Sequence, residues 1–306
     1  AEKRKMKNLY FILWIVLSLF PVFTFAQVKI DTEFFPESSF RDADGNTNGS
    51  GNLWKMSGNC TFPLFVKHND KGQLYAWTAT LNCSYALLEN KGLASKINQG
   101  KMLNCSFNIS HLRPLSHKWS LISSLGGGIY SAPNEITLNS VLANGAVLFI
   151  YKLRKNMEIG IGTGLTNSYG IPMVMPMICF NWISSGKVEI KVDMSNAMKA
   201  SVATRIGKKI KLELTAIEMN GMASVVQVNG KSKIYSSAML GSYLCPEYHI
   251  NEKTALYICA GGNWLREIKL TDRSFRGFLD SFKENNKNEW RFNPSGYLAA
   301  GLKYGF

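Results

Sequence analysis

Residues 75–87 read YAWTATLNCSYAL, and this stretch decides the fold class. Its odd positions are mostly apolar or aromatic, and its even positions are small, most of them with hydroxyl or amide groups. Such an alternation of period two is typical of a β-strand with two different faces, and no helix produces it. Residues 103–110, 187–194 and 199–206 alternate in the same way. The chain is therefore predicted to be an all-β protein.

The length of these alternations favours a membrane barrel over a soluble β-sandwich. Sandwich strands usually have about five or six residues, whereas membrane-spanning strands need about 9–11. The polar faces carry Ser, Thr and Asn where a solvent-facing sandwich would carry more Lys and Glu. Aromatic residues near the predicted strand ends would form interface belts; they are Trp77, Tyr85, Trp119, Tyr130, Tyr151, Trp182, Tyr243, Trp264 and Tyr304. We predict a transmembrane antiparallel up-and-down β-barrel.

The connections between the predicted strands alternate in length. Short links occur at 69–72, 113–117, 154–156, 185–186, 207–209 and 251–253. Mostly longer links lie between them, at 37–52, 88–101, 131–138, 166–172, 195–197, 219–232 and 267–292. Short periplasmic turns and longer external loops are typical of outer-membrane barrels. Counting from a strand at 28–35 to one at 294–306 predicts about 14 strands. Twelve is the alternative, because 187–206 could form one irregular hairpin and the strand at 28–35 has Pro36 at its edge.

The composition excludes several other classes of protein. The chain has 306 residues, of which 46% are apolar and 18% are charged, below the roughly 25% charged residues of an ordinary soluble domain. This apolar content excludes a disordered chain, and no run of like charge exceeds three residues, which excludes a charged nucleic-acid-binding tail. The formal net charge is +14, but the basic residues are interleaved with acidic ones, so no nucleic acid is expected as a partner.

The N-terminus has the parts of a secretory signal. Four basic residues precede an apolar run from Leu9 to Phe25, and Ala26 offers a cleavage point before Gln27. We predict a signal peptide at 1–26 and one barrel domain at 27–306, whose formal net charge would be +11. A retained membrane anchor is the alternative, which Pro21 within the run disfavours.

The C-terminal residues 296–306, GYLAAGLKYGF, alternate and end in an aromatic residue. They resemble the assembly signal of Gram-negative outer-membrane barrels, with Gly301, Tyr304 and Phe306 at matching positions. Ala300 departs from that signal, which prefers a polar residue there. The resemblance implies the barrel-assembly machinery as a partner and the outer membrane of a Gram-negative bacterium as the location.

A second resemblance lies at 168–187, SYGIPMVMPMICFNWISSGK. A Pro-containing loop leads there into a strand that ends in Trp182 before a tight turn. This pattern is similar to an uncharacterised family of Gram-negative outer-membrane β-barrels, a porin-like domain of unknown function, over about Val141 to Phe306. The family implies the architecture and no particular activity.

No pattern of residues points to catalysis, a cofactor or a metal. The six cysteines lack CxxC spacing and are interpreted as small buried hydrophobic residues, with a disulfide framework as the alternative. Ser110 and His111 are adjacent, so on a strand they would point to opposite faces and could not act as a hydrolase pair. The glycines at 126–128 are predicted to mark a bend or close packing in the barrel wall. All four histidines are expected at or near short turns: His68, His111, His117 and His249.

Charged residues on the polar faces are predicted to line the lumen. They are Glu158, Glu189, Lys191, Asp193, Lys199, Arg205, Lys211 and Glu213. Two roles stay open: a mutually paired ladder that fills the barrel, in which Asp193 would lie opposite Lys199, or the lining of a water-filled pore. In an open pore, Lys191, Arg205 and Lys211 would give a weak preference for anions.

Basic residues of the longer loops are predicted to contact phosphates of outer-membrane lipids. They are Lys91, Lys96, Lys101, Arg266, Lys269, Arg273 and Arg276. Together these observations predict a porin-like channel or transporter for small solutes that is not an enzyme. The alternatives are a closed structural or partner-binding barrel and, more distantly, an outer-membrane lipid-modifying enzyme.

Overall fold

The computed structural model describes residues 26–42, 44–97, 99–166, 173–184, 188–194, 197–228, 230–272 and 290–305. The strands are β1 (Gln27–Arg41), β2 (Thr47–His68), β3 (Leu74–Gly92), β4 (Lys101–Pro114), β5 (Trp119–Ser131), β6 (Val141–Arg154), β7 (Met157–Thr166), β8 (Met173–Ser184), β9 (Val188–Asp193), β10 (Met198–Ile206), β11 (Ile210–Val228), β12 (Lys231–His249), β13 (Thr254–Asp272), β14 (Trp290–Phe292) and β15 (Ser295–Tyr304). Two short helices, α3 (Ala94–Ile97) and η1 (Leu138–Ser140), lie in connections. No helix within the described ranges is long and apolar enough to span a membrane.

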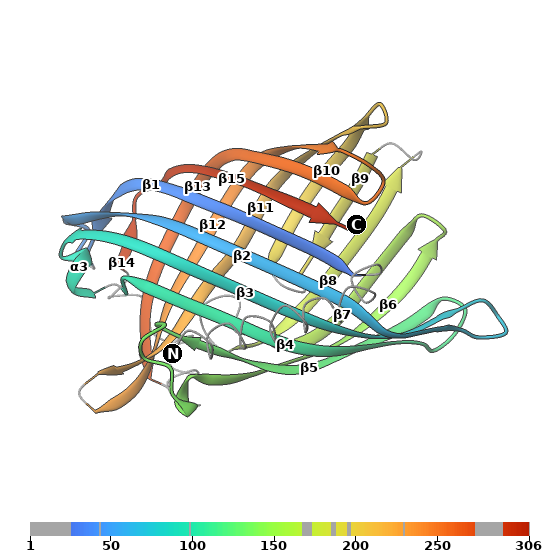
Figure 1. Ribbon diagram of the computed structural model, residues 1–306, viewed down its shortest axis with the longest axis horizontal. Helices are drawn as coiled ribbons and strands as arrows, with labels where there is room; N and C mark the ends of the chain where they lie inside the picture. The colour runs from blue at the N-terminus through green and yellow to red at the C-terminus, as the bar shows by residue number, and fades with distance from the viewer. Residues whose placement is uncertain are drawn as a thin grey trace, which may run out of the picture.

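The strands form a closed antiparallel barrel (Figure 1). Each strand from β1 to β13 pairs with the next along the chain, and β15 pairs with both β13 and β1. The three-residue β14 also bridges β13 and β1, so β14 and β15 share one position in the ring. The ring therefore has fourteen positions and confirms the predicted fold class. β9 and β10 are separate paired strands, which removes the twelve-strand alternative.

The two ends of the barrel differ. One end, called the turn end, holds the short links and both ends of the described chain, where the Gly305 amide donates to the Lys253 carbonyl at 2.7 Å. The opposite end, called the loop end, carries α3, η1 and the β11–β12 hairpin (Figure 1). Two loop-end links are shorter than predicted, 42–46 instead of 37–52 and 229–230 instead of 219–232, because the strands there continue to pair.

The outer face of the barrel is apolar. Leu81, Phe107 and Ile161 on three different strands are 43%, 46% and 65% exposed, as expected for side chains that contact lipid. Trp77 stacks on His111 and Trp119 packs on Tyr151, both pairs near the turn end. These residues fit an interface belt.

Two of the aromatic residues predicted for the belts lie inside the barrel instead. Tyr130 is 5% exposed and bonds the Asn144 side chain, and Tyr243 donates its hydroxyl to Glu218. Each shares the strand parity of its inward-facing neighbours, because alternate residues of a strand point to opposite faces. Proximity to a strand end was therefore the wrong criterion for these two.

Four of the six cysteines form disulfides, which corrects the interpretation of all six as buried thiols. Cys83 and Cys105 are direct partners across β3 and β4, with Cα atoms 4.1 Å apart. Cys245 and Cys259 join β12 and β13, with Cα atoms 4.2 Å apart. Register between strands decides such pairing, and the spacing of cysteines in the sequence does not reveal register. Cys60 and Cys179 remain free.

We expect the oxidised, denatured protein to react with two equivalents of a thiol reagent and the reduced protein with six. The compartment predicted from the signal sequence permits disulfides. Mass spectrometry after alkylation would identify Cys60 and Cys179 as the labelled residues. Labelling of all six cysteines without reductant would contradict both cross-strand bonds.

The lumen and its closed mouth, a candidate functional site

The end of the β11–β12 hairpin closes the loop end of the barrel. Residues 222–237, called the mouth hairpin, include two runs, 222–226 and 234–237, in which every residue is buried. A strand in a barrel wall has one covered face and one lipid face, so burial would alternate along it. Continuous burial means that both faces of this hairpin are covered by protein, and the hairpin therefore lies across the mouth.

The mouth hairpin packs on the inner surface of distant strands. Ala223, Val225 and Ile234 form a cluster with Tyr130 of β5 and Leu142 of β6. The Asn104 side chain of β4, with its amide oriented to satisfy both groups, donates to the Ala223 carbonyl and accepts from the Ala223 amide. These contacts cross the lumen, since β11 is not a neighbour of β4, β5 or β6 in the ring.

A second apolar cluster fills the mouth and includes Met222, Val226 and Tyr235 of the hairpin. Phe40 and Phe292 are almost fully buried, with ring centroids 5.0 Å apart. The Arg266 guanidinium lies over the Phe292 ring and donates to the Gly51 carbonyl at 3.2 Å. Arg266 is 2% exposed. Its predicted contact with lipid phosphate is therefore wrong, because a bulge in β13 turns its side chain inward.

The other predicted lipid-contacting residues lie in different settings. Lys91 pairs with Glu37 at 2.9 Å, and Lys269 pairs with Glu267 at 2.7 Å. Lys96 and Lys101 are exposed near the loop end. Arg273 and Arg276 lie outside the described residues, as do Phe306 and most of the predicted signal peptide.

Beneath the closed mouth lies a cavity of about 650 Å³. Its lining runs from Gln27 and Thr61 near the turn end to Asn104, Tyr130 and Gly221 under the mouth hairpin. The lining includes Gly58, Gly145, Gly164 and Gly221. A Cβ atom on Gly126 or Gly128 would overlap backbone oxygens of β4, so the close packing predicted there is confirmed.

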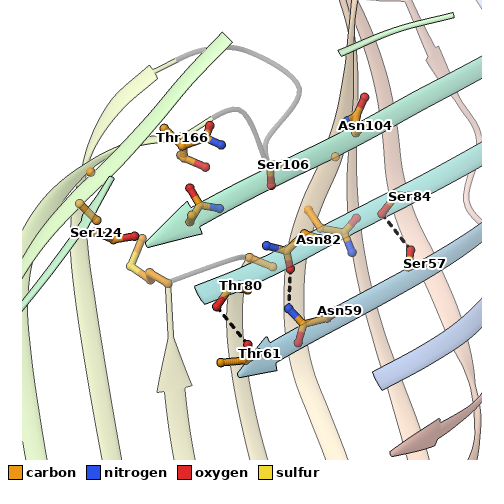
Figure 2. A pocket seen from close by; sticks show the side chains of 18 of the residues that line it. Ser57, Asn59, Thr61, Thr80, Asn82, Ser84, Asn104, Ser106, Ser124 and Thr166 are labelled. Atoms are coloured by element: carbon orange, nitrogen blue, oxygen red, sulfur yellow. Dashed lines mark hydrogen bonds between the residues drawn. The ribbon is translucent and has the colours of Figure 1, made fainter. Parts of the chain in front are cut away.

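One side of the cavity, called the neutral wall, consists of uncharged polar side chains on β2 to β6. Direct cross-strand partners hydrogen-bond in pairs: Ser57 with Ser84 at 3.0 Å, Asn59 with Asn82 at 2.5 Å, and Thr61 with Thr80 at 3.0 Å (Figure 2). Ser110 donates to Ser124 at 2.9 Å on the neighbouring strands. Ser106, Asn108 and Asn144 complete the wall.

An adjoining part of the lining, called the charged wall, consists of ionisable residues on β1, β2 and β11. Lys29 contacts Asp31 at 2.7 Å, and Lys55 contacts Glu33 at 2.6 Å. Glu33 also accepts a hydrogen bond from Tyr297 at 2.9 Å. These four residues and Glu218 line the cavity, so two lysines face three carboxylates there.

The structure places the eight predicted lumen residues on the inner face of β7 and β9–β11, but outside the lining of the large cavity. Lys199 contacts Glu213 at 2.6 Å, and Lys211 contacts Glu189 at 3.0 Å. Asp193 is the register partner of Lys199. Of the two roles left open, this arrangement fits the paired ladder. Glu158, Lys191 and Arg205 lie on the same face.

The remaining candidate groups lie apart. Ser110 faces the lumen, whereas His111 stacks on Trp77 outside, so the predicted opposite orientation is confirmed. His249 contacts Glu247 at 2.9 Å, and Glu247 contacts Lys303 at 2.5 Å. Across the described ranges, no group of three or more His, Cys, Asp or Glu side chains is arranged to hold a metal ion.

A profile of a protein family described as "Domain of unknown function (DUF6268)" matches residues 22–305. The chain belongs to this family. The match covers nearly the whole chain, whereas the sequence resemblance was traced only from about Val141. Among curated proteins, none matches this DUF6268 chain.

Several solved outer-membrane proteins resemble this DUF6268 barrel. The COG4313 outer membrane channel from Pseudomonas putida F1 is 10% identical, with a TM-score of 0.45, covering 91% of this chain and 95% of that one. The toluene transporter TodX from Pseudomonas putida is 9% identical, with a TM-score of 0.40 and coverages of 92% and 89%. The outer membrane protease OmpT from Escherichia coli is 10% identical, with a TM-score of 0.27 and coverages of 92% and 97%.

Gly301 of the DUF6268 barrel, predicted as part of the assembly signal, has a packing role inside the wall. A Cβ atom there would lie 2.5 Å from the Tyr257 ring and 2.6 Å from the Ile30 carbonyl oxygen. Tyr257 donates its hydroxyl to Asp31 at 2.8 Å. The glycine therefore lets the tyrosine ring lie flat against β15 and reach β1.

We expect Gly301→Val to lower the free energy of unfolding by about 1–3 kcal/mol, the usual cost of overpacking. The midpoint of urea unfolding in detergent or lipid would measure the change. Ala300→Val, one residue away on the lipid face, is the matched control and should be nearly neutral. Equal midpoints for the two variants would contradict the packing role.

Proposed function

We propose that this protein is an outer-membrane channel for small solutes whose external mouth is closed by a movable segment, the mouth hairpin. One observation carries the proposal: a closed fourteen-position barrel contains a cavity of about 650 Å³, lined by both polar and apolar side chains, that ends under the mouth hairpin. The hairpin is held on β5 and β6 by a small apolar cluster, and its residues Met222, Val226 and Tyr235 belong to the larger apolar cluster of the mouth. Its two strands pair with each other as far as Val228 and Lys231, so it can move as one unit.

The same proposal names two partners of the barrel, outer-membrane lipids and the barrel-assembly machinery. The apolar outer face fits contact with outer-membrane lipids. The alternating C-terminal strand, with Tyr304 near its end, fits recognition by the barrel-assembly machinery. No nucleic acid is proposed as a partner.

Excision of the mouth hairpin tests the channel. Gly221 and Ala238 are register partners, so residues 222–237 can be replaced by an Asn-Gly turn without changing the pairing below. In a planar bilayer, the wild type should be closed for most of the recording. The excision variant should show steady conductance steps.

A shorter excision provides the control. Val226 and Lys233 are also register partners, and replacing 227–232 by Asn-Gly removes the tip while keeping the buried parts. This variant should stay as closed as the wild type. A fully excised variant that folds, as judged by heat-modifiable migration, but remains silent would refute the channel.

The filled mouth favours a second candidate, a closed structural or partner-binding barrel. Phe40, Phe292 and Arg266 are buried there as in a protein core. Under this alternative, excision of 222–237 would lower stability and open no conductance. An enzymatic role is not proposed, because Ser110 and His111 face opposite sides of the wall.

A further inference from the structure

We infer that the cavity of this channel selects small uncharged polyhydroxylated solutes, such as polyols and sugars, over anions. The inference rests on the proposed channel function and names its class of solute. It depends on the contrast between the two walls of the cavity. Hydrogen-bonding groups on the neutral wall are available to a solute, whereas both lysines of the charged wall are already paired with carboxylates.

The neutral wall offers many hydrogen bonds at regular spacing. Neighbouring strands are about 4.8 Å apart, and residues on one face recur about every 6.6 Å along a strand. Each Ser, Thr or Asn side chain both donates and accepts, so pairs such as Ser57–Ser84 and Asn59–Asn82 keep further donors and acceptors for a solute. Ser106 and Asn108 line the cavity and make no side-chain hydrogen bond among the described residues. Hydroxyl groups of a polyol match this array.

The charged wall offers an anion no free cation. Lys29 and Lys55 are the described lysines that line the cavity, and each is within 2.7 Å of a carboxylate. Glu218, the third carboxylate, accepts hydrogen bonds from Asn220 and Tyr243. An anionic solute would have to displace one of these pairs. The anion preference expected from Lys191, Arg205 and Lys211 does not arise in this cavity, because none of the three lines it.

An apolar solute fits the neutral wall poorly, although apolar side chains such as Leu148, Met175 and Met177 line another part of the cavity. It would cover the hydroxyl and amide groups of the neutral wall and leave them without partners, which costs roughly 1–3 kcal/mol for each buried group. The volume of about 650 Å³ lies within the roughly 300–1,000 Å³ of small-molecule sites. A neutral, hydroxyl-rich solute satisfies both the size and the chemistry.

The test compares sorbitol with gluconate, which is similar in size and carries one negative charge. Proteoliposomes that contain the excision variant without residues 222–237 would report the entry of each solute. Calorimetry of the wild-type barrel would report the binding of each solute. Sorbitol should enter and bind more strongly than gluconate. Asn108→Lys, which places a free cation on the neutral wall, should shift the sorbitol-to-gluconate ratio about tenfold toward gluconate.

A second variant isolates the hydrogen bonds. Replacing both Asn59 and Asn82 by Leu removes one rung while keeping its shape, a change that is often nearly neutral for folding. Sorbitol binding should weaken about tenfold. Asn181→Leu is the matched control, because Asn181 faces the lumen on β8 outside this cavity, and it should leave binding unchanged.

The outcomes separate the inference from the channel itself. Equal entry of sorbitol and gluconate, or unchanged sorbitol binding in the Asn59 and Asn82 variant, would overturn the inference and leave the channel intact. If no solute enters even after excision, the channel is refuted. Sorbitol binding to the intact barrel would in that case still support the neutral wall as a binding site. If sorbitol did not bind either, the neutral wall would be refuted as a binding site too.

Discussion

Replacing Leu81 by arginine is expected to lower the free energy of unfolding by about 2–4 kcal/mol, the cost of a basic side chain on the lipid face near the bilayer midplane. Leu81 is 43% exposed on the outer face of β3. It lies four residues from Trp77 in the turn-end belt, which places it about 9 Å deeper in a band roughly 25 Å tall. Urea titration of the barrel folded into lipid vesicles would measure the loss.

Thr80→Arg is the matched control for this prediction. Thr80 is adjacent to Leu81, but its hydroxyl hydrogen-bonds Thr61 at 3.0 Å on the cavity side. An arginine there can reach the polar cavity, so its cost should be much smaller. Equal losses for the two variants would mean that the assignment of faces, or the membrane itself, is wrong.

Phe292→Ala is expected to cost about 3–5 kcal/mol, the usual penalty for truncating a buried aromatic residue. The ring is 2% exposed, packs on Phe40 and lies under the Arg266 guanidinium. Removal of the ring would leave a cavity in the mouth, and the buried Arg266 guanidinium would lose its cation–π contact. The same titration would measure the change, and single-channel recordings should show more frequent openings.

Phe107→Ala provides the comparison for the mouth. Phe107 is 46% exposed on the lipid face, so lipid can fill the space that its ring leaves. Its truncation should cost less and should not change the conductance. A Phe292→Ala variant as stable as Phe107→Ala would show that the mouth is not packed as a core.

The sequence alone determined the architecture of this protein. The alternation at 75–87 placed Leu81 outside and Thr80 inside. The alternation of short and longer links along the chain predicted the ring of fourteen positions. Both features are local consequences of the strand period and of the length needed to cross a membrane. The same parity correctly separated Ser110 from His111.

Features that depend on contacts between distant strands could not be derived in this way. Cys83 and Cys105 pair because of strand register. The mouth hairpin leaves the barrel wall and buries both of its faces, so the rule of one lipid face and one lumen face fails there. The sequence has Asn-Gly at 229–230, a preferred two-residue hairpin sequence, and this was the signal that could have predicted the pairing of Val228 with Lys231.

Charge placement also required the tertiary structure. Arg266 reads as a loop residue in the sequence, but a bulge in β13 turns it onto Phe292. The polar faces were evident, but the register between β1 and β2 decides that Lys29 lies beside Asn59 and that the charged and neutral walls adjoin there. The sequence period determines on which face of its own strand a side chain lies, whereas the closing of the ring decides which strands that side chain faces across the lumen.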